Sequence, residues 1–194
     1  MSTRRVIFPP PETWTRKASH HPSRRETNMT TNENSDKASD YRRAALFTKY
    51  HRQGNKAGQV AIVEEVNETG RVPQLLFALL VLHKTFITRF RTPDGIDLLA
   101  DFIHSIATLV TAGMPTPDVV RAAQILDHHG HNDHDAIAKV MSDATAEGRA
   151  TETFLALLDH YEVSLPELSG RAGIAFIEAN ALAMLEVEYR PDGE

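Results

Sequence analysis

The sequence predicts an all-α fold made of two tandem copies of a four-helix unit, a helical-repeat-like bundle of about eight helices. Three observations predict it. Apolar residues recur at helical spacing from residue 40 to residue 188, and no segment alternates with the period of two that strands require. The sequence also aligns with itself when each position is paired with the one 78 positions later, which we call the repeat shift.

The self-alignment is ungapped over residues 43–96 and contains 11 identities in 54 positions, where chance would give about three. The identities gather in short runs, namely 43–45 with 121–123, 70–71 with 148–149, 78–80 with 156–158 and 95–96 with 173–174, together with His51 and His129. We therefore predict one domain over residues 40–188, made of a repeat at 41–115 and a repeat at 116–188, with a C-terminal tail at 189–194.

The first two helices of the first unit are predicted at residues 41–52 and 56–68, separated by Gly54-Asn55. Their apolar residues share one face of each helix and are expected to point inward: Ala44, Ala45, Phe47 and Thr48 in the first helix, and Val60, Ile62, Val63 and Val66 in the second. Gly70 stands where a residue of left-handed conformation commonly ends a helix, so the second helix is expected to stop there.

The third helix is predicted to be the buried centre of its unit, because residues 75–90 are apolar around most of the helix circumference. Pro73 suits its first turn, where a missing amide hydrogen costs nothing. The segment Thr92-Pro93-Asp94 supplies an N-cap, a first-turn proline and a first-turn carboxylate, and predicts the start of the fourth helix. Thr116-Pro117-Asp118 repeats this signal and opens the second unit.

The N-terminal segment differs in composition from the rest of the chain. Residues 1–39 lack apolar periodicity and are predicted to form a disordered basic tail. Residues 1–28 hold six Lys or Arg against two acidic residues, so the remainder carries a net charge of −9. An acidic body repels phosphate, which argues against nucleic acid as its partner. We also hypothesise that translation starts at Met29, because Arg25-Glu26 fits a purine-rich ribosome-binding sequence upstream.

Composition also limits the class of protein. The chain has no cysteine, which excludes disulfides and thiolate metal sites and suits a cytoplasmic location. Its longest apolar run, residues 75–82, is too short to span a bilayer, and no signal peptide is evident, so no membrane association is expected. The frequent Ala, Asp and Arg are typical of a high-GC bacterium or its phage.

One cluster of residues could carry metal chemistry. Four imidazoles, those of His128, His129, His131 and His134, lie close together in the sequence, with Asp133 and Asp135 among them. Such a set could bind zinc or nickel. The alternative is ordinary chemistry of a helix junction: histidines favour the last turn of a helix, Gly130 could occupy the position that follows the helix, and Asn132 or Asp133 could cap the next one. The first unit has only His51 at this junction, so the cluster occurs in the second unit alone.

A second recurring feature is the pair Gly70-Arg71 and Gly148-Arg149. An arginine beside a helix N-terminus could bind an anion. The structural alternative is a duplicated turn in which the arginine folds back over preceding carbonyls. His83, His104 and His160 lie on apolar helices, where a lone histidine is usually a satisfied, partly buried residue.

No catalytic motif is present, since the chain contains no phosphate-binding loop, nucleophile elbow or H-E-x-x-H segment. The sequence therefore gives no positive case for an enzyme and none for a bound cofactor beyond a possible zinc or nickel ion. We predict a non-enzymatic helical-repeat protein that acts through protein–protein interaction or self-association. The alternative is a divalent-metal-binding or metal-dependent protein that uses the cluster at residues 128–135.

Overall fold

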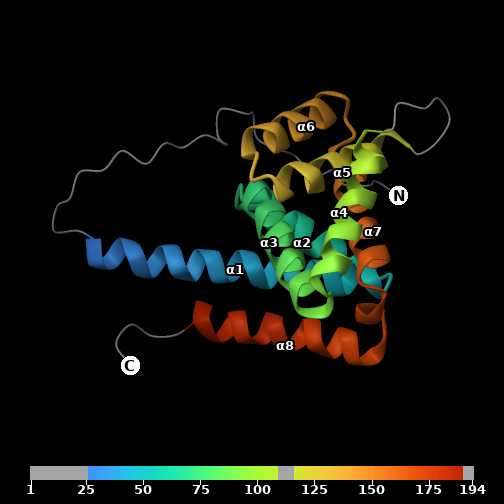
Figure 1. Ribbon diagram of the computed structural model, residues 1–194. Helices are drawn as coiled ribbons and strands as arrows, with labels where there is room; N and C mark the ends of the chain where they lie inside the picture. The colour runs from blue at the N-terminus through green and yellow to red at the C-terminus, as the bar shows by residue number, and fades with distance from the viewer. Residues whose placement is uncertain (1–25, 109–115, 190–194) are drawn as a thin grey trace.

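The fold is all-helical. The computed structural model describes residues 26–108 and 116–189, with side chains from residue 33 onward. Within these ranges it contains no strand, one short 3₁₀ helix and eight α-helices (Figure 1): α1 Glu26–Arg52, α2 Lys56–Glu68, α3 Val72–Phe90, α4 Pro93–Ala107, α5 Pro117–Gly130, α6 His134–Ala146, α7 Ala150–Ser164, η2 Pro166–Ser169 and α8 Arg171–Glu188. The all-helical prediction and, over these ranges, the expected number of helices are confirmed.

The centre of the molecule is formed by α3 and α7, as the apolar sequence of the third helix predicts. Most of α3 is buried, including Leu76, Leu79 and Leu80. Both helices share one core with α1 and α5, in which the rings of Phe47 and Phe154 lie 5.7 Å apart. Apolar burial of this kind supplies most of the stability of a helical domain.

The longest pairing of helices joins the two ends of the described chain. α1 and α8 run side by side and antiparallel across one edge of the molecule (Figure 1). Polar contacts follow the pair along its length: Ser35 Oγ donates to the Glu188 carbonyl at 3.0 Å, and Lys49 Nζ lies 2.8 Å from Glu178 Oε1. No helix among the described residues is both long and apolar enough to cross a membrane.

Two further packings involve α4 and α8. α4 packs mainly on α5 and only slightly on α3, and α8 packs on α1 and η2. The fourth helix of each half therefore lies on the first helix of the other half, where the first half is residues 26–107 and the second half residues 117–188. The chain is thus closed on itself rather than extended.

The structure corrects two sequence-based expectations. The first helix begins at Glu26, so the predicted disordered tail cannot extend to residue 39; its last residues pack on α8, and Ala38 is buried. Residues 1–25 of that tail and 190–194 of the C-terminal tail lie outside the described residues. Val60 is 46% exposed instead of inward, because the buried stripe of α2 is Ile62, Val63 and Val66.

Candidate functional site

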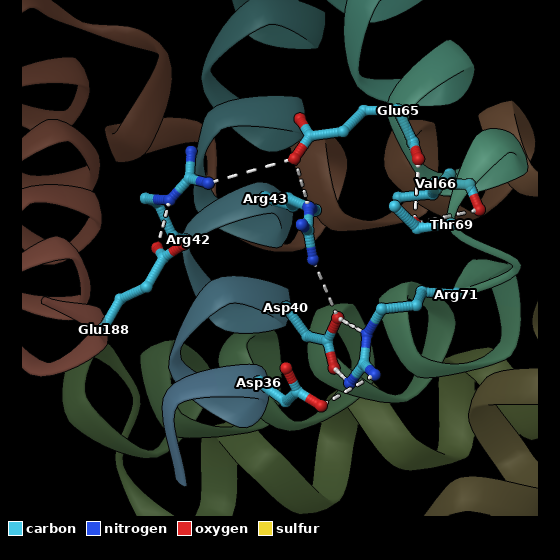
Figure 2. A network of polar contacts seen from close by, with 9 residues as sticks. All are labelled: Asp36, Asp40, Arg42, Arg43, Glu65, Val66, Thr69, Arg71 and Glu188. Atoms are coloured by element: carbon cyan, nitrogen blue, oxygen red, sulfur yellow. Dashed lines mark hydrogen bonds and ion pairs between the residues drawn. The ribbon is translucent and has the colours of Figure 1, made fainter. Parts of the chain in front are cut away.

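The two Gly-Arg turns are structural. Gly70 and Gly148 have φ angles of +66° and +68°, the left-handed conformation that the sequence predicts at Gly70. Arg71 then reaches back to α1, where its guanidinium donates to both carboxylate oxygens of Asp40 at 2.8 and 2.6 Å (Figure 2). Arg149 binds Asp118 in the same way. Each arginine therefore binds a carboxylate of this chain and does not fold back over the preceding carbonyls as expected.

Each of these carboxylates is buried and bound by a second arginine. Asp40 also accepts from Arg43 at 3.2 Å, and Asp118 accepts from Arg121 at 3.3 Å. The hydrogen bond to Asp40 raises the pKa of Arg71, as a carboxylate partner should. Sequence analysis missed Asp40 and assigned Asp118 only to the start of a helix, although extending the self-alignment a little further towards the N-terminus would have paired the two residues.

Figure 2 also shows how this network ties α1 to its neighbours. Arg43 Nε donates to Glu65 Oε1 of α2 at 2.8 Å, and Arg42 Nε donates to Glu188 Oε2 of α8 at 2.7 Å. Both arginines are at most one-fifth exposed, so these charge-assisted bonds are stronger than ordinary surface pairs. The network belongs to the fold, since each of its guanidiniums is bound by a carboxylate of this chain.

The histidine cluster lies at the junction of α5 and α6, as predicted, and its imidazoles are spread out. His128 and His129 are half-buried in the last turn of α5, whereas His131 and His134 are exposed. His131 Nδ1 lies 2.8 Å from the Asp127 carbonyl, and the His134 ring meets Phe77 edge-on at 5.2 Å. No three of these imidazoles form a close ligand set in the described chain. Zinc or nickel binding by the cluster stays a prediction.

The turn within this cluster differs in one detail from the expected one. Gly130 is the last residue of α5, and the left-handed conformation falls on Asn132, whose φ is 57°. Asparagine is one of the few side chains that tolerate this conformation. Asp133 then caps α6 by accepting from the Ala136 amide at 3.0 Å, as predicted.

An apolar pocket of about 310 Å³ lies beside this junction, between α3, α4, α5 and α7. Ile96, Leu99 and Ile103 of α4 form one wall. Its polar lining includes the ionisable side chains of Lys84, Asp127, His129 and His131. Burial and the nearby Lys84 ammonium lower the pKa of His129, which favours the neutral imidazole.

The equivalent place in the first half is filled. The repeat shift pairs His51 with His129 and Arg52 with Gly130. The Arg52 guanidinium donates to the carbonyls of Tyr161 at 2.9 Å and Leu165 at 3.0 Å, and to Ser169 Oγ at 2.8 Å. Gly130 has no side chain to do the same, which leaves the second half with open space.

His51 itself meets two carboxylates of α7. Its Nε2 lies 2.9 Å from Asp159 Oδ1 and 3.7 Å from Glu162 Oε2. Over the described ranges, these three side chains are the only set of three possible metal ligands whose donor atoms all lie within 4.8 Å of one another. Sequence analysis noticed His51 only as a repeat match, because its partners lie far along the chain.

His83 and Tyr161 stack at the centre of the molecule, with ring centroids 3.7 Å apart. His83 Nδ1 lies 2.9 Å from the Leu79 carbonyl and donates to it, and Nε2 has no hydrogen-bond partner among the described residues. Complete burial lowers the pKa of His83 to about 3, so the ring is neutral. The prediction of a satisfied, partly buried histidine is therefore wrong for His83.

The other two lone histidines fit the prediction better. His160 Nε2 lies 3.1 Å from the Val119 carbonyl and is half-buried. His104 is exposed beside Asp127, at 3.3 Å. Both contacts are of the kind that structural histidines make at the surface of a helical domain.

No protein-family model, curated protein or solved structure matches this chain.

Proposed function

We propose that this chain is a non-enzymatic binding protein built from two copies of one four-helix unit, and that it holds a basic, amphipathic segment of another protein against α4. The proposal has two parts. The first concerns the origin of the fold in a duplication, and the second concerns the surface that the fold exposes.

Recurrence of the helix boundaries at the repeat shift supports the duplication. The shift carries both ends of α2 onto those of α6, and it carries the first residues of α3 and α4 onto those of α7 and α8. The left-handed residues recur at the same spacing, Gly54 with Asn132 and Gly70 with Gly148. A self-alignment that coincides with helix ends and turn conformations is expected when two units share one ancestor.

The way the halves pack supports a closed pair of units rather than an open array. Each fourth helix lies on the first helix of the other half. His83 and Tyr161, which the repeat shift pairs, stack on each other. Contact between equivalent positions is what a two-fold arrangement produces, whereas stacked repeats place each unit only against its neighbours.

The outer face of α4 carries the second part of the proposal. Its side chains of Leu98 and Phe102 are 71% and 50% exposed. Three carboxylates on the same helix, those of Asp94, Asp97 and Asp101, are exposed as well. Apolar side chains rimmed by charge mark interaction surfaces, and carboxylates favour a basic partner. A basic amphipathic helix would match both features.

Site-specific photocrosslinking in the native host tests this proposal. A photoreactive residue at position 98 or 102 should give a product whose linked peptide on the partner is rich in Lys or Arg, and the yield should fall as salt is raised. The same residue at the exposed position 57 on α2 is the control. A product joining two copies of this chain would replace the proposal by self-association, and equal yields at all three positions would refute it.

A further inference from the structure

We infer that His51, Asp159 and Glu162 form a binding site for one divalent transition-metal ion of the zinc type, held between the last turn of α1 and the C-terminal half of α7. The site is distinct from the histidine cluster at residues 128–135 and from the face of α4.

The donor atoms are already placed for coordination. Tetrahedral zinc with ligands at about 2.0–2.2 Å requires donors about 3.3 Å apart. The two distances from His51 Nε2, 2.9 Å to Asp159 and 3.7 Å to Glu162, lie on either side of that value. All three donor atoms fall within 4.8 Å of one another, so small side-chain rotations are enough to centre an ion among them.

The chain holds these ligands from well-separated parts of the sequence. His51 lies in the last turn of α1 with its side chain 14% exposed, which fixes the imidazole. Asp159 and Glu162 are three residues apart on α7 and so share one face of that helix. Their side chains are 68% and 42% exposed, which lets an ion enter from solvent and leaves room for water as a further ligand.

An outer layer of hydrogen bonds orients Glu162. Ser169 Oγ donates to Glu162 Oε1 at 3.1 Å, which leaves Oε2 directed at His51. Arg52 in turn donates to that Ser169 hydroxyl at 2.8 Å. Ligating carboxylates are commonly held by such outer partners. Arg52 places one positive charge near the site, but the two carboxylates carry two negative charges, so the charge around the site still favours a cation.

The second half of the molecule shows that the fold does not need these carboxylates. The repeat shift pairs Asp159 with Val81 and Glu162 with Lys84. The imidazole that corresponds to His51 is His129, and Lys84 lies close enough to lower its pKa. The junction after α5 therefore keeps the histidine, but Val81 and Lys84 stand where the junction after α1 has its two carboxylates. The acidic neighbours are found only at the junction after α1. The imidazole donor favours zinc-type ions over magnesium or calcium.

The decisive experiment is equilibrium dialysis of the full-length, tag-free chain against Zn²⁺, with bound metal measured by mass spectrometry and affinity by calorimetry. We expect one tightly bound ion per chain. Asp159→Asn and Glu162→Gln keep the size of each side chain and remove its charge. Each should weaken binding by at least the roughly 10–100-fold that loss of an outer partner costs.

Two control variants separate this site from its rivals. His129→Gln removes the equivalent imidazole of the other half and should leave the tight site unchanged. A double change, His131→Gln with His134→Gln, removes exposed histidines of the cluster and should also leave it unchanged. Thermal unfolding without metal confirms that all variants fold. The inference is overturned if no stoichiometric zinc binds, if Asp159→Asn and Glu162→Gln bind as tightly as the parent chain, or if only the cluster variant loses the ion.

Discussion

The end of α1 and the end of α5 share a turn of similar geometry and differ in the side chains around it. Both helices stop at positions that the repeat shift pairs, and both enter a turn through a left-handed residue. The helix that follows each turn is capped by Asn55 or Asp133. At the end of α1, the side chain of Arg52 fills the space against α7, and His51 contacts the carboxylates of Asp159 and Glu162. At the end of α5, Gly130 has no side chain to fill the pocket, and His129 lies near Lys84. The turn and the cap recur at both junctions and are needed for the fold, whereas the side chains beside them differ and are free to serve a function.

The same contrast appears where the third helix meets the fourth. α3 continues to Phe90 before α4 begins, but α7 stops at Ser164 and the chain folds inward through η2, burying Leu165 and Leu168. These residues build a second small core with Ile177 and Ala181. α8 is therefore fastened more firmly than α4, whose only buried residue is Ala107.

The largest expected effect is at Gly173. A Cβ added there would lie 2.3 Å from Leu168 Cα, which is backbone and cannot rotate away. Gly173→Ala should lower the free energy of unfolding by more than about 3 kcal/mol. Urea unfolding followed by circular dichroism measures it.

Gly95 is the matched control, because it holds the equivalent position in the first half. Its added Cβ would meet only side-chain atoms of Arg91 and Thr92, the nearest being the Thr92 hydroxyl at 3.3 Å. Gly95→Ala should change stability by less than about 1 kcal/mol in either direction. If both variants lose stability equally, the close approach of α8 to η2 is not what distinguishes the two halves.

The next effect is a loss of stability in acid caused by His83. Its pKa is about 3 in the folded protein and about 6.5 when unfolded, so protonation favours the unfolded state. Above pH 6.5 His83 is neutral in both states and costs the fold no stability. Between pH 6.5 and pH 3 the free energy of unfolding falls by about 1.4 kcal/mol for each unit that the pH is lowered. Unfolding free energies measured from pH 7 to pH 4 should show this slope.

His83→Leu isolates that contribution. It removes the ionisable ring and its unpartnered Nε2 and keeps an apolar side chain against Tyr161. We expect a change of less than about 1.5 kcal/mol at pH 7 and a flatter pH dependence. An unchanged slope would assign the acid sensitivity to the carboxylate–arginine pairs instead.

A smaller loss is expected from Asp40→Ala. It removes the carboxylate that Arg71 and Arg43 share, and Arg43 is only 9% exposed. Arg43 keeps its bond to Glu65, and Arg71 keeps its contact with Asp36. We expect a cost of about 2 kcal/mol, below the roughly 3–5 kcal/mol of a fully buried pair because Arg71 reaches solvent. Asp118→Ala is the counterpart, and it should cost less because Arg149 is 47% exposed. Thermal unfolding of both variants ranks them, and the reverse order would contradict this account.

Sequence alone predicted the helices well because helix ends carry local signals. Gly70, Thr92 and Asp133 act through close neighbours in the sequence, and all three behave as expected. The apolar period likewise predicted the burial of the third helix. The start of α1 was missed because its first turns are polar, and its later turns are held by α8, which lies at the far end of the described chain.

The candidate sites were harder to predict because they depend on contacts across the molecule. His51 and Asp159 are 108 residues apart, and no local pattern links them. The pocket was invisible for a related reason: it exists where Gly130 lacks the side chain that Arg52 supplies in the other half. The conspicuous histidine cluster drew attention by composition, whereas the closest ligand set in the described chain contains only one histidine.

The smallest expected effect concerns Arg52 and Gly130, the two residues that the repeat shift pairs at the ends of α1 and α5. Arg52→Ala removes charge-assisted hydrogen bonds to the carbonyls of Tyr161 and Leu165. Burial lowers the pKa of Arg52, so its removal also relieves a desolvated charge, and the net cost should be only about 1.5 kcal/mol.

Gly130→Ala should act in the opposite direction. Its added Cβ meets no atom within 4 Å, and its φ is not in the left-handed region, so alanine should stabilise the end of α5 by up to about 1 kcal/mol. Chemical unfolding of both variants gives the two signs. A neutral Arg52→Ala would mean that the filled junction gains no stability from its arginine, and the pocket beside α5 would then be an incidental gap in packing. A destabilising Gly130→Ala would contradict the account of the open junction.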